Sequence, residues 1–274
     1  MRTFLQAIFF ALTNLNAVGF VRGTIYRGKL KAICLPGLNC YSCPGSLGSC
    51  PIGAIQSVLT TGNYRFPFYA AGFLLLYGSL FGRLVCGWLC PFGFVQDLIY
   101  RIPSVKKRNR FPGDRILRRG KILALVVFVI ALPLFVLNIA GLGTPWFCKY
   151  LCPGGALFAG LPLVAANRGL SDVIGALFFL KLGILLIFLF AAVVVFRPFC
   201  KYLCPLGLLY GFFNNVSLFR YKIDRQKCNG CGACEKTCGM GVPVLEDIDS
   251  PECIRCGLCG KKCPQGAIYA SWKK

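Results

Sequence analysis

Eight cysteines near the carboxyl end of the chain fall into two sets with the same spacing, Cys-x2-Cys-x2-Cys-x3-Cys. The sets are Cys228, Cys231, Cys234 and Cys238, followed by Cys253, Cys256, Cys259 and Cys263. This is the spacing of two-cluster ferredoxins, in which the fourth cysteine of each set binds the other cluster. We therefore predict that one [4Fe–4S] cluster binds Cys228, Cys231, Cys234 and Cys263, and that a second binds Cys253, Cys256, Cys259 and Cys238.

Structural zinc is the alternative chemistry for closely spaced cysteines. Zinc sites more often divide their ligands into two distant pairs, whereas this spacing suits a cubane with four neighbouring irons. Cys238 is followed by Gly239 where proline is usual, which leaves the ligand set intact. Gly230, Gly232 and Gly257 allow backbone N–H groups to approach cluster sulfurs. The tail is therefore expected to bind clusters.

Four further cysteines each begin a repeated motif, Cys-Pro-x-Gly. They are Cys50, Cys90, Cys152 and Cys204. Proline in a first helical turn costs no hydrogen bond, so each motif predicts a short helix just after its cysteine. The positive end of such a helix favours an anionic, thiolate-bound cluster. Three motifs carry a second cysteine four residues earlier, and the hexapeptide Cys-Lys-Tyr-Leu-Cys-Pro occurs twice, at Cys148 and at Cys200. Buried structural cysteines are the alternative, but this repetition favours ligand hairpins.

Long apolar stretches separate the motifs. Hydrophobic residues make up 56% of the 274 residues, and the mean hydropathy is +0.65. Four stretches approach the length of about 20 residues that crosses a bilayer: residues 3–21, 66–82, 122–142 and 174–196. The first contains Gln6, Asn14 and Asn16, and a cleaved signal peptide is its alternative, although no small-residue cleavage site follows it. We predict a mostly α fold, with a four-helix transmembrane bundle over residues 1–221 and an α+β two-cluster ferredoxin domain over residues 222–274.

The basic residues indicate how these segments face the membrane. The chain has 31 Lys and Arg against 9 Asp and Glu, and the basic residues flank the apolar stretches. This distribution favours an anionic membrane face over nucleic acid. Ten basic residues lie in 83–121 and twelve after Phe196, whereas 143–172 has two and 22–65 has five. We therefore predict a multi-pass protein of a bacterial or archaeal cytoplasmic membrane with both termini in the cytoplasm.

This orientation pairs the motifs by side of the membrane. The inner pair predicts one cluster on Cys86, Cys90, Cys200 and Cys204. The outer pair predicts a less certain cluster on Cys148, Cys152, Cys43 and Cys50. Cys34 and Cys40 would then form an outer disulfide or bind something else. Alternatively, the four cysteines of the first loop hold their own cluster and leave Cys148 and Cys152 to a partner. The total would be about four [4Fe–4S] clusters.

The absence of histidine narrows the chemistry. With no histidine in the sequence, a His-ligated haem is excluded, as is most histidine-based acid–base chemistry. No series of intramembrane carboxylates is visible, so proton pumping by this chain alone is not expected. No nucleophile, acid–base pair or substrate pocket is identifiable either. We expect a redox subunit of an oxidoreductase complex, with the substrate chemistry carried by a partner.

The chain resembles the polytopic membrane ferredoxins of the NapH type, which are also similar to the membrane half of NosR. The resemblance covers nearly the whole chain and rests on the four apolar stretches, the hairpins at Cys86/Cys90 and Cys200/Cys204, and the ferredoxin tail. It implies electron transfer between the quinol pool or cytosolic donors and an extracytoplasmic reductase, in anaerobic metabolism. The chain departs from the family in its cysteine-rich first loop and in the hairpin at Cys148/Cys152, and it lacks the flavin-binding domain of NosR-like proteins.

The leading hypothesis is a transmembrane electron conduit. Six basic residues of the tail could attract an acidic donor such as a ferredoxin, flavodoxin or flavoprotein, or could only keep the tail soluble or contact anionic lipid: Lys222, Arg225, Lys227, Lys236, Lys261 and Lys262. A redox-sensing or maturation factor is a second hypothesis. A third is a quinol-oxidising subunit, with Asp97, Trp88 and Trp146 as candidate quinone-pocket residues.

Overall fold

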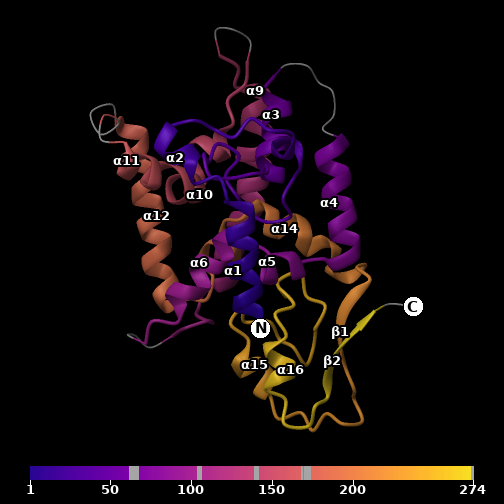
Figure 1. Ribbon diagram of the computed structural model, residues 1–274. Helices are drawn as coiled ribbons and strands as arrows, with labels where there is room; N and C mark the ends of the chain where they lie inside the picture. The colour runs from indigo at the N-terminus through magenta and orange to yellow at the C-terminus, as the bar shows by residue number, and fades with distance from the viewer. Residues whose placement is uncertain (62–67, 104–106, 139–141, 168, 170–173, 273–274) are drawn as a thin grey trace.

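The structure is mostly helical, with a small sheet near the carboxyl end (Figure 1). It is a computed structural model that describes residues 1–61, 68–103, 107–138, 142–167, 169 and 174–272. The helices of the first half are α1 Arg2–Thr13, α2 Val18–Arg22, η1 Lys29–Ala32, α3 Pro51–Thr60, α4 Phe68–Phe81, α5 Leu84–Trp88, α6 Pro91–Tyr100, α7 Asp114–Arg118, α8 Gly120–Leu123, η2 Ala124–Ala131 and α9 Leu132–Phe135. The second half contributes η3 Phe147–Leu151, α10 Pro153–Gly155, η4 Ala156–Gly160, α11 Leu161–Ala166, α12 Ala176–Val194, α13 Pro198–Tyr202, α14 Pro205–Phe212, η6 Phe213–Asn215, α15 Ala233–Thr237 and α16 Leu258–Lys261.

Helices begin at each of the four Cys-Pro-x-Gly motifs, as their sequence predicts. In α3, α6, α10 and α14 the cysteine is the N-cap and proline is the first helical residue. The Gly93 N–H donates to Sγ of Cys90 over 3.4 Å, and the Gly207 N–H donates to Sγ of Cys204 over the same distance. These N–H groups have no carbonyl partner within a first helical turn, so the sulfur takes that role.

The four predicted spans are helical over different lengths. Among the residues that the structure describes, α12 is the one helix long and apolar enough to cross a membrane by itself. The first stretch breaks between α1 and α2, where Asn14 donates to the Phe10 carbonyl and Asn16 to the Pro44 carbonyl. Such side-chain bonds to the backbone compete with helical hydrogen bonding. The second stretch holds the 14-residue α4.

The third predicted span, residues 122–142, is helical only in its first part. The segments α8, η2 and α9 follow one another from Gly120 to Phe135, and η2 has π-helical hydrogen bonding. Pro133 lies at the start of α9, where its missing N–H fits the change in hydrogen-bonding pattern. The remainder includes an isolated bridge between Leu137 and Gly143, and residues 139–141 lie outside the described part.

The carboxyl-terminal unit has the small sheet that the ferredoxin prediction implies. Strands β1 Phe219–Ile223 and β2 Ile268–Trp272 pair antiparallel, so β1 spans the predicted boundary between residues 221 and 222. Gly232 and Gly257 are the N-caps of α15 and α16, with φ of 69° and 74°. Glycine adopts this left-handed backbone without strain, and its use at equivalent points marks the internal repeat of the tail.

The tail lies at one end of the molecule, beside the amino terminus (Figure 1). Helices α4 and α12 run along opposite sides of the remainder, with α5, α6 and α14 between them near the tail. The short helices α2, α3 and α10 lie at the far end. The repeat thus places the cysteine of α6 and that of α14 near the tail, and those of α3 and α10 away from it.

Candidate iron–sulfur sites

Two cavities in the tail are each lined by four cysteines. One is lined by Cys228, Cys231, Cys234 and Cys263, and the other by Cys238, Cys253, Cys256 and Cys259. The fold therefore brings together the two sets that the spacing predicts, with the fourth cysteines exchanged. The exchanged pair also has matching hydrogen bonds: the Val242 N–H donates to Sγ of Cys238, and the Ala267 N–H to Sγ of Cys263, each over 3.4 Å.

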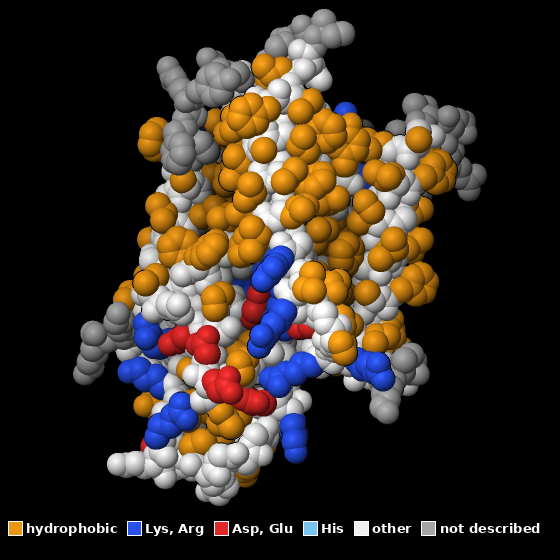
Figure 2. Space-filling view, turned by 180° about the vertical axis from the view of Figure 1, so that it is seen from behind, with side chains coloured by type: hydrophobic (Ala, Val, Ile, Leu, Met, Phe, Trp, Pro, Cys, Tyr) orange, Lys and Arg blue, Asp and Glu red, His pale blue; other side chains and the backbone are white. Residues whose placement is uncertain are grey.

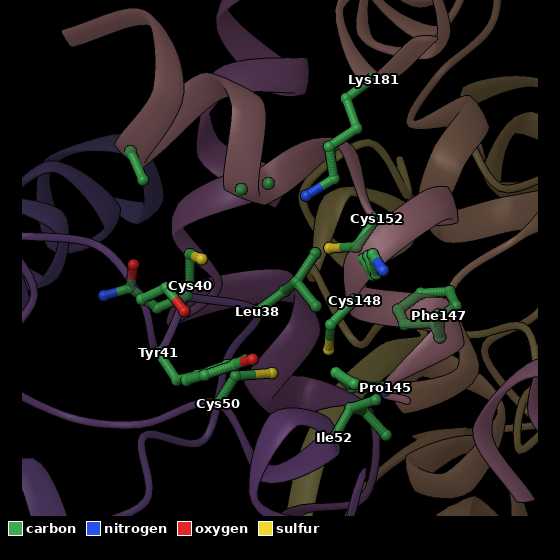
Figure 3. Close-up of a pocket in the computed structure, with 16 residues that line it drawn as sticks. Leu38, Cys40, Tyr41, Cys50, Ile52, Pro145, Phe147, Cys148, Cys152 and Lys181 are labelled. Atoms are coloured by element: carbon green, nitrogen blue, oxygen red, sulfur yellow. The ribbon is translucent and has the colours of Figure 1, made fainter. Parts of the chain in front are cut away.

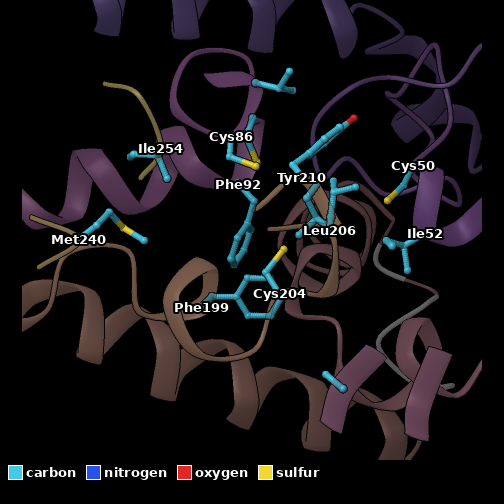
Figure 4. Close-up of a cluster of buried hydrophobic side chains, with 14 of the residues drawn as sticks. Cys50, Ile52, Cys86, Phe92, Phe199, Cys204, Leu206, Tyr210, Met240 and Ile254 are labelled. Atoms are coloured by element: carbon cyan, nitrogen blue, oxygen red, sulfur yellow. The ribbon is translucent and has the colours of Figure 1, made fainter. Parts of the chain in front are cut away.

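The two inner hairpins form a third group of four cysteines. All four side chains are buried: Cys86, Cys90, Cys200 and Cys204. The thiol of Cys204 interacts electrostatically with the other three. Around them pack aromatic residues of both hairpins, with the rings of Phe92 and Phe199 5.0 Å apart and nearly perpendicular (Figure 4). The four thiols of the predicted inner set are thus buried beside aromatic rings.

A reciprocal pair of buried arginines holds the inner hairpins together. Each arginine lies three residues before the first cysteine of its hairpin, in the pattern Arg-x2-Cys-x3-Cys-Pro. Arg83 donates to the Cys200 carbonyl over 3.1 Å, and Arg197 donates to the Cys86 carbonyl. Arg197 has a φ of 50°, a left-handed conformation that costs energy in a non-glycine residue. The sequence prediction missed both arginines, although the pattern occurs twice.

Each of these arginines is paired with a carboxylate, but the carboxylates come from different places. Asp97, on α6, accepts from Nε of Arg197 over 2.6 Å. Glu252, from the tail, accepts from Arg83 over 2.9 Å. Asp97 lies seven residues after the helix-capping cysteine of its motif, and Gly211 occupies the same position on α14. A Cβ on Gly211 would approach the Pro251 carbonyl to 2.7 Å, so glycine there admits the tail segment that supplies the missing carboxylate.

The tail is anchored to the inner hairpins around Glu252. Burial alone would raise the pKa of Glu252, but the positive charges of Arg83 and Lys121 outweigh it and lower the pKa to about 2. Trp88 Nε1 donates to the Arg255 carbonyl over 3.1 Å. Arg255 is itself buried and has a φ of 51°. These contacts fix the segment around Cys253 against the hairpin of α5.

Two glutamines connect paired motifs. Gln56 and Gln96 each lie six residues after the cysteine of their motif. Gln96 accepts from the Phe199 N–H over 3.1 Å and donates to Sγ of Cys200 over 3.2 Å. Gln56 accepts from the Cys148 N–H over 3.1 Å but donates to the Phe128 carbonyl. The repeat therefore pairs the motif of α6 with that of α14, and the motif of α3 with that of α10.

The fourth group of cysteines surrounds a cavity of about 310 Å³ away from the tail (Figure 3). Its cysteines are Cys40, Cys50, Cys148 and Cys152. This differs from the predicted outer set, in which Cys43 took the place of Cys40. The thiol of Cys43 is buried and donates to the Phe158 carbonyl over 3.0 Å, so it does not line this cavity.

The first loop and the residues suggested for a quinone pocket were also named in the sequence prediction. All 18 cysteines are free, so the suggested disulfide between Cys34 and Cys40 is absent, and Cys34 is buried. The Asp97 carboxylate is engaged by Arg197 and, over 3.0 Å, by Arg2. The indole nitrogen of Trp146 is buried and has no hydrogen-bond partner in the part of the chain that the structure describes.

The donor sets fit iron–sulfur clusters. Within the described ranges, no group of three or more Cys, Asp or Glu side chains is placed to hold a single metal ion. In three of the groups four thiols instead surround a common cavity, and the thiol is the ligand by which cubane clusters are bound. Backbone N–H groups that donate to sulfur are the usual supporting contacts.

Comparison with protein families agrees with this chemistry. A family model described as "4Fe-4S binding domain" matches residues 63–110, 123–170 and 177–225, which together make up more than half of the chain. The chain belongs to this 4Fe–4S binding family. A second model of the same description matches residues 246–269 in the tail. Each of the first three matches contains one Cys-x3-Cys-Pro hairpin, so the repetition of these three hairpins and the prediction of several [4Fe–4S] clusters are confirmed.

Several curated relatives carry ferredoxin-type names. The chain is 32% identical to an uncharacterised protein of Methanocaldococcus jannaschii over 61% of this chain and 56% of that protein. It is 32% identical to the "Methylamine utilization ferredoxin-type protein MauN" of Paracoccus denitrificans, over 61% of this chain and 50% of that protein. It is 29% identical to the "Ferredoxin-type protein NapH" of Escherichia coli, over 63% and 54%. The predicted resemblance to NapH-type ferredoxins is confirmed. The match spans about half the length of these relatives, and no solved structure matches the chain.

Proposed function

We propose that this chain is a multi-pass membrane protein that carries electrons between a cytosolic redox partner and the membrane or the outer side of the cell. Bound clusters, about four in number, supply one-electron carriers. The proposed ligand sets are the two in the tail, the inner set, and an outer set formed by Cys40, Cys50, Cys148 and Cys152. The observation that carries the proposal is that residues between neighbouring sets are in direct contact from the tail to the outer cavity.

The first link joins the tail to the inner hairpins. Ile254 lies beside the tail ligand Cys253 and lines the same cavity. A Cβ on Gly87, which follows the inner ligand Cys86, would approach the Ile254 carbonyl to 2.3 Å. Glycine therefore allows the backbones that carry the two ligand sets to touch. Close contact of this kind shortens the path of an electron between two sites.

The second link joins the inner set to the outer one. Leu38 lines the outer cavity, and its neighbour Gly37 lies against the inner hairpin. A Cβ on Gly37 would lie 2.8 Å from the Cα of Cys90. The first loop therefore folds back onto the inner hairpin, and adjacent residues of this loop contact the segment of Cys90 and line the outer cavity.

The exposed apolar surface supports a membrane location. Helix α12 has a mean hydropathy of 2.8, and only 11% of its most apolar stretch is buried. A core helix of a soluble protein would be mostly covered, whereas a helix exposed on apolar faces requires lipid or a partner. Figure 2 shows apolar side chains over the upper part of the molecule and Lys, Arg, Asp and Glu gathered in the lower part.

The proposed topology has four spans with both termini in the cytoplasm. The amino terminus lies at the tail end of the molecule, where Arg2 pairs with Asp97 over 3.0 Å (Figure 1). Arg118, in the basic segment after the second span, donates to the Met240 carbonyl of the tail over 2.8 Å. The amino terminus, this segment and the tail therefore share one side, which we assign to the cytoplasm from the basic-residue bias. The outer cavity, at the opposite end, would face the exterior.

The tail is the proposed docking site for a soluble electron-transfer partner. Cys231 is exposed, so its cluster would lie near the surface. Exposed lysines, including Lys227, Lys236 and Lys262, surround this end of the chain. A positive surface of this kind raises the association rate of an acidic partner such as a ferredoxin, flavodoxin or flavoprotein.

Metal analysis and topology mapping test the proposal. Anaerobically purified protein should contain about sixteen iron and sixteen sulfide per chain, the content of four clusters. Thiol labelling should find the loop over residues 39–51 from outside, and a reporter fused after Lys274 should be cytoplasmic. About eight iron, or labelling of that loop from the cytoplasmic side alone, would contradict the electron conduit.

A further inference from the structure

Helix α12 carries a lysine at the outer cavity. Lys181 lies in the first part of this apolar helix and lines the cavity together with the four cysteines. Figure 3 shows its side chain extending from the helix toward Cys152. Its Nζ would lie 3.3 Å from a Cβ on Gly155, one of the residues that follow Cys152. The ammonium group is therefore directed at the helix start that bears a thiol.

Lys181, which is partly exposed, has no carboxylate partner among the described residues, unlike several fully buried cations of this protein. Arg83, Arg197 and Lys201 each form an ion pair with a carboxylate. In the described part of the chain, Lys181 has neither an ion pair nor a hydrogen bond. The groups on which its charge acts are the thiols of Cys40, Cys148 and Cys152. A cation on a helix of this hydropathy is costly unless an anion compensates it.

A second polar side chain at the same cavity also lacks a partner. Asn39 is 1% exposed and lines the cavity next to Cys40. Both its amide nitrogen and its amide oxygen are buried without a hydrogen-bond partner among the described residues. Leaving a buried amide unsatisfied costs free energy, so such groups usually face a ligand or another polar atom. The amide NH₂ group can donate to a sulfur atom of a cluster that the neighbouring cysteines bind.

We propose that Lys181 and Asn39 are the charge and hydrogen-bond partners of the cluster in the outer cavity, and that they raise its reduction potential. The inference rests on the proposed function, because it requires a cluster on the four cysteines of this cavity. A cluster with four thiolate ligands is an anion, and reduction adds one electron and therefore one negative charge. Lys181 stabilises the more negative form, and the Asn39 amide donates more strongly to its sulfur atoms.

Reduction potentials of charge variants test this role. Lys181→Met removes the charge and keeps an apolar chain of similar length, while Lys181→Arg keeps the charge. The control is Lys29→Met, the same change at an exposed lysine of η1. Each purified chain is titrated anaerobically under electron paramagnetic resonance, and the outer signal is identified as the one lost in Cys152→Ser. Iron is measured on the same samples.

The expected result is a lower potential for the outer signal alone in Lys181→Met. The equilibrium constant for its reduction should fall at least tenfold, which is 59 mV for one electron. Lys181→Arg should stay near the wild type and Lys29→Met should be unchanged. Asn39→Leu should shift the same signal in the same direction by a smaller amount.

Loss of about four iron in Lys181→Met alone, with the tail and inner signals intact, also supports the role, because the anion then cannot be held without its cation. An unchanged outer potential in Lys181→Met with full iron overturns the inference and leaves the proposed function standing. An equal shift in Lys29→Met also overturns it. A wild-type chain with no signal sensitive to Cys152→Ser contradicts the outer cluster itself.

Discussion

At the inner site the two hairpins support each other, whereas at the outer site the same motif depends on other parts of the chain. Arg83 and Arg197 each hold the opposite inner hairpin and each have a carboxylate. Pro145 stands at the equivalent position before Cys148, and Ser46 stands where Cys50 would have its second cysteine. The outer cavity instead receives its fourth thiol from the loop and its cation from α12.

The difference shows which features of the repeat are essential to a site and which can be replaced. Both sites keep a thiol at the start of a helix, because the backbone fixes that position and its N–H groups. Charge compensation and the remaining thiols can come from any element that packs nearby. The inner site is thereby linked to the tail through Glu252, and the outer site to α12 through Lys181.

The largest effect should come from removing one thiol on each side. Cys204→Ser and Cys90→Ser should abolish the same spectroscopic signal, and the double variant should be little worse than either single one, since the residues act on one cluster. Cys152→Ser should abolish a different signal. Each of these three single variants should stop electron transfer across vesicle membranes, while a soluble donor should still reduce the clusters of the tail. Loss of one common signal in Cys90→Ser and Cys152→Ser would show that the two sites are one.

The outer loop permits a sharper test, because it offers two cysteines three residues apart. Cys40→Ser should lose the outer signal and about four iron, because Cys40 lines the cavity. Cys43→Ser should keep both, since its thiol is turned to the Phe158 carbonyl. Iron analysis and electron paramagnetic resonance distinguish the two variants. The reverse result would restore the set inferred from the repeat, with Cys43 as the ligand.

The link between the tail and the inner site should weaken when its carboxylate is removed. Glu252→Gln leaves Arg83 buried without its counter-charge, and breaking a buried pair in this way costs about 3 kcal/mol. Hydrogen exchange of the segment around Pro251 should therefore increase, and the inner signal should be reduced more slowly from the tail. Glu246→Gln, at an exposed glutamate with no ion pair in the described residues, is the matched control. Equal exchange in the two variants would show that Glu252 does not anchor the tail.

The sequence predicted best what depends on short-range spacing. Within each run the cysteines of the tail lie three or four residues apart, so the grouping of the first three follows from local backbone geometry. The exchange of the fourth follows from the known spacing of two-cluster ferredoxins, and the structure gathers the same two sets. The helices after the four Cys-Pro motifs follow for the same reason. The choice between Cys40 and Cys43 depends on the course of a long loop, which is set by remote contacts such as that of Cys43 with Phe158.

The carboxylate that pairs with Arg83 could not be predicted from local sequence patterns either. Asp97 lies on the same repeat unit as Cys90, but its counterpart Glu252 is 169 residues from Arg83 and lies in the tail. Only the packed structure shows that Gly211 leaves room for it. The sequence prediction also missed Gln56 and Gln96, although each lies six residues after the cysteine of its motif. The sequence of a helix does not show which group a polar side chain on it will contact.

The smallest expected effect concerns those glutamines, which occupy the same position in the repeat but make different contacts. Gln96 donates to Sγ of Cys200, so Gln96→Leu removes a hydrogen bond to a thiolate ligand. Because such a bond stabilises the more negative, reduced state, the inner potential should fall by about 40 mV, which is about 1 kcal/mol for one electron. Gln56 donates to the Phe128 carbonyl instead, so Gln56→Leu should lower stability without moving the outer potential. Redox titration of both signals in both variants checks this contrast. If Gln56→Leu shifts the outer potential as much as Gln96→Leu shifts the inner one, the two glutamines act alike. Their common contact would then be the hydrogen bond that each amide oxygen accepts from a backbone N–H group.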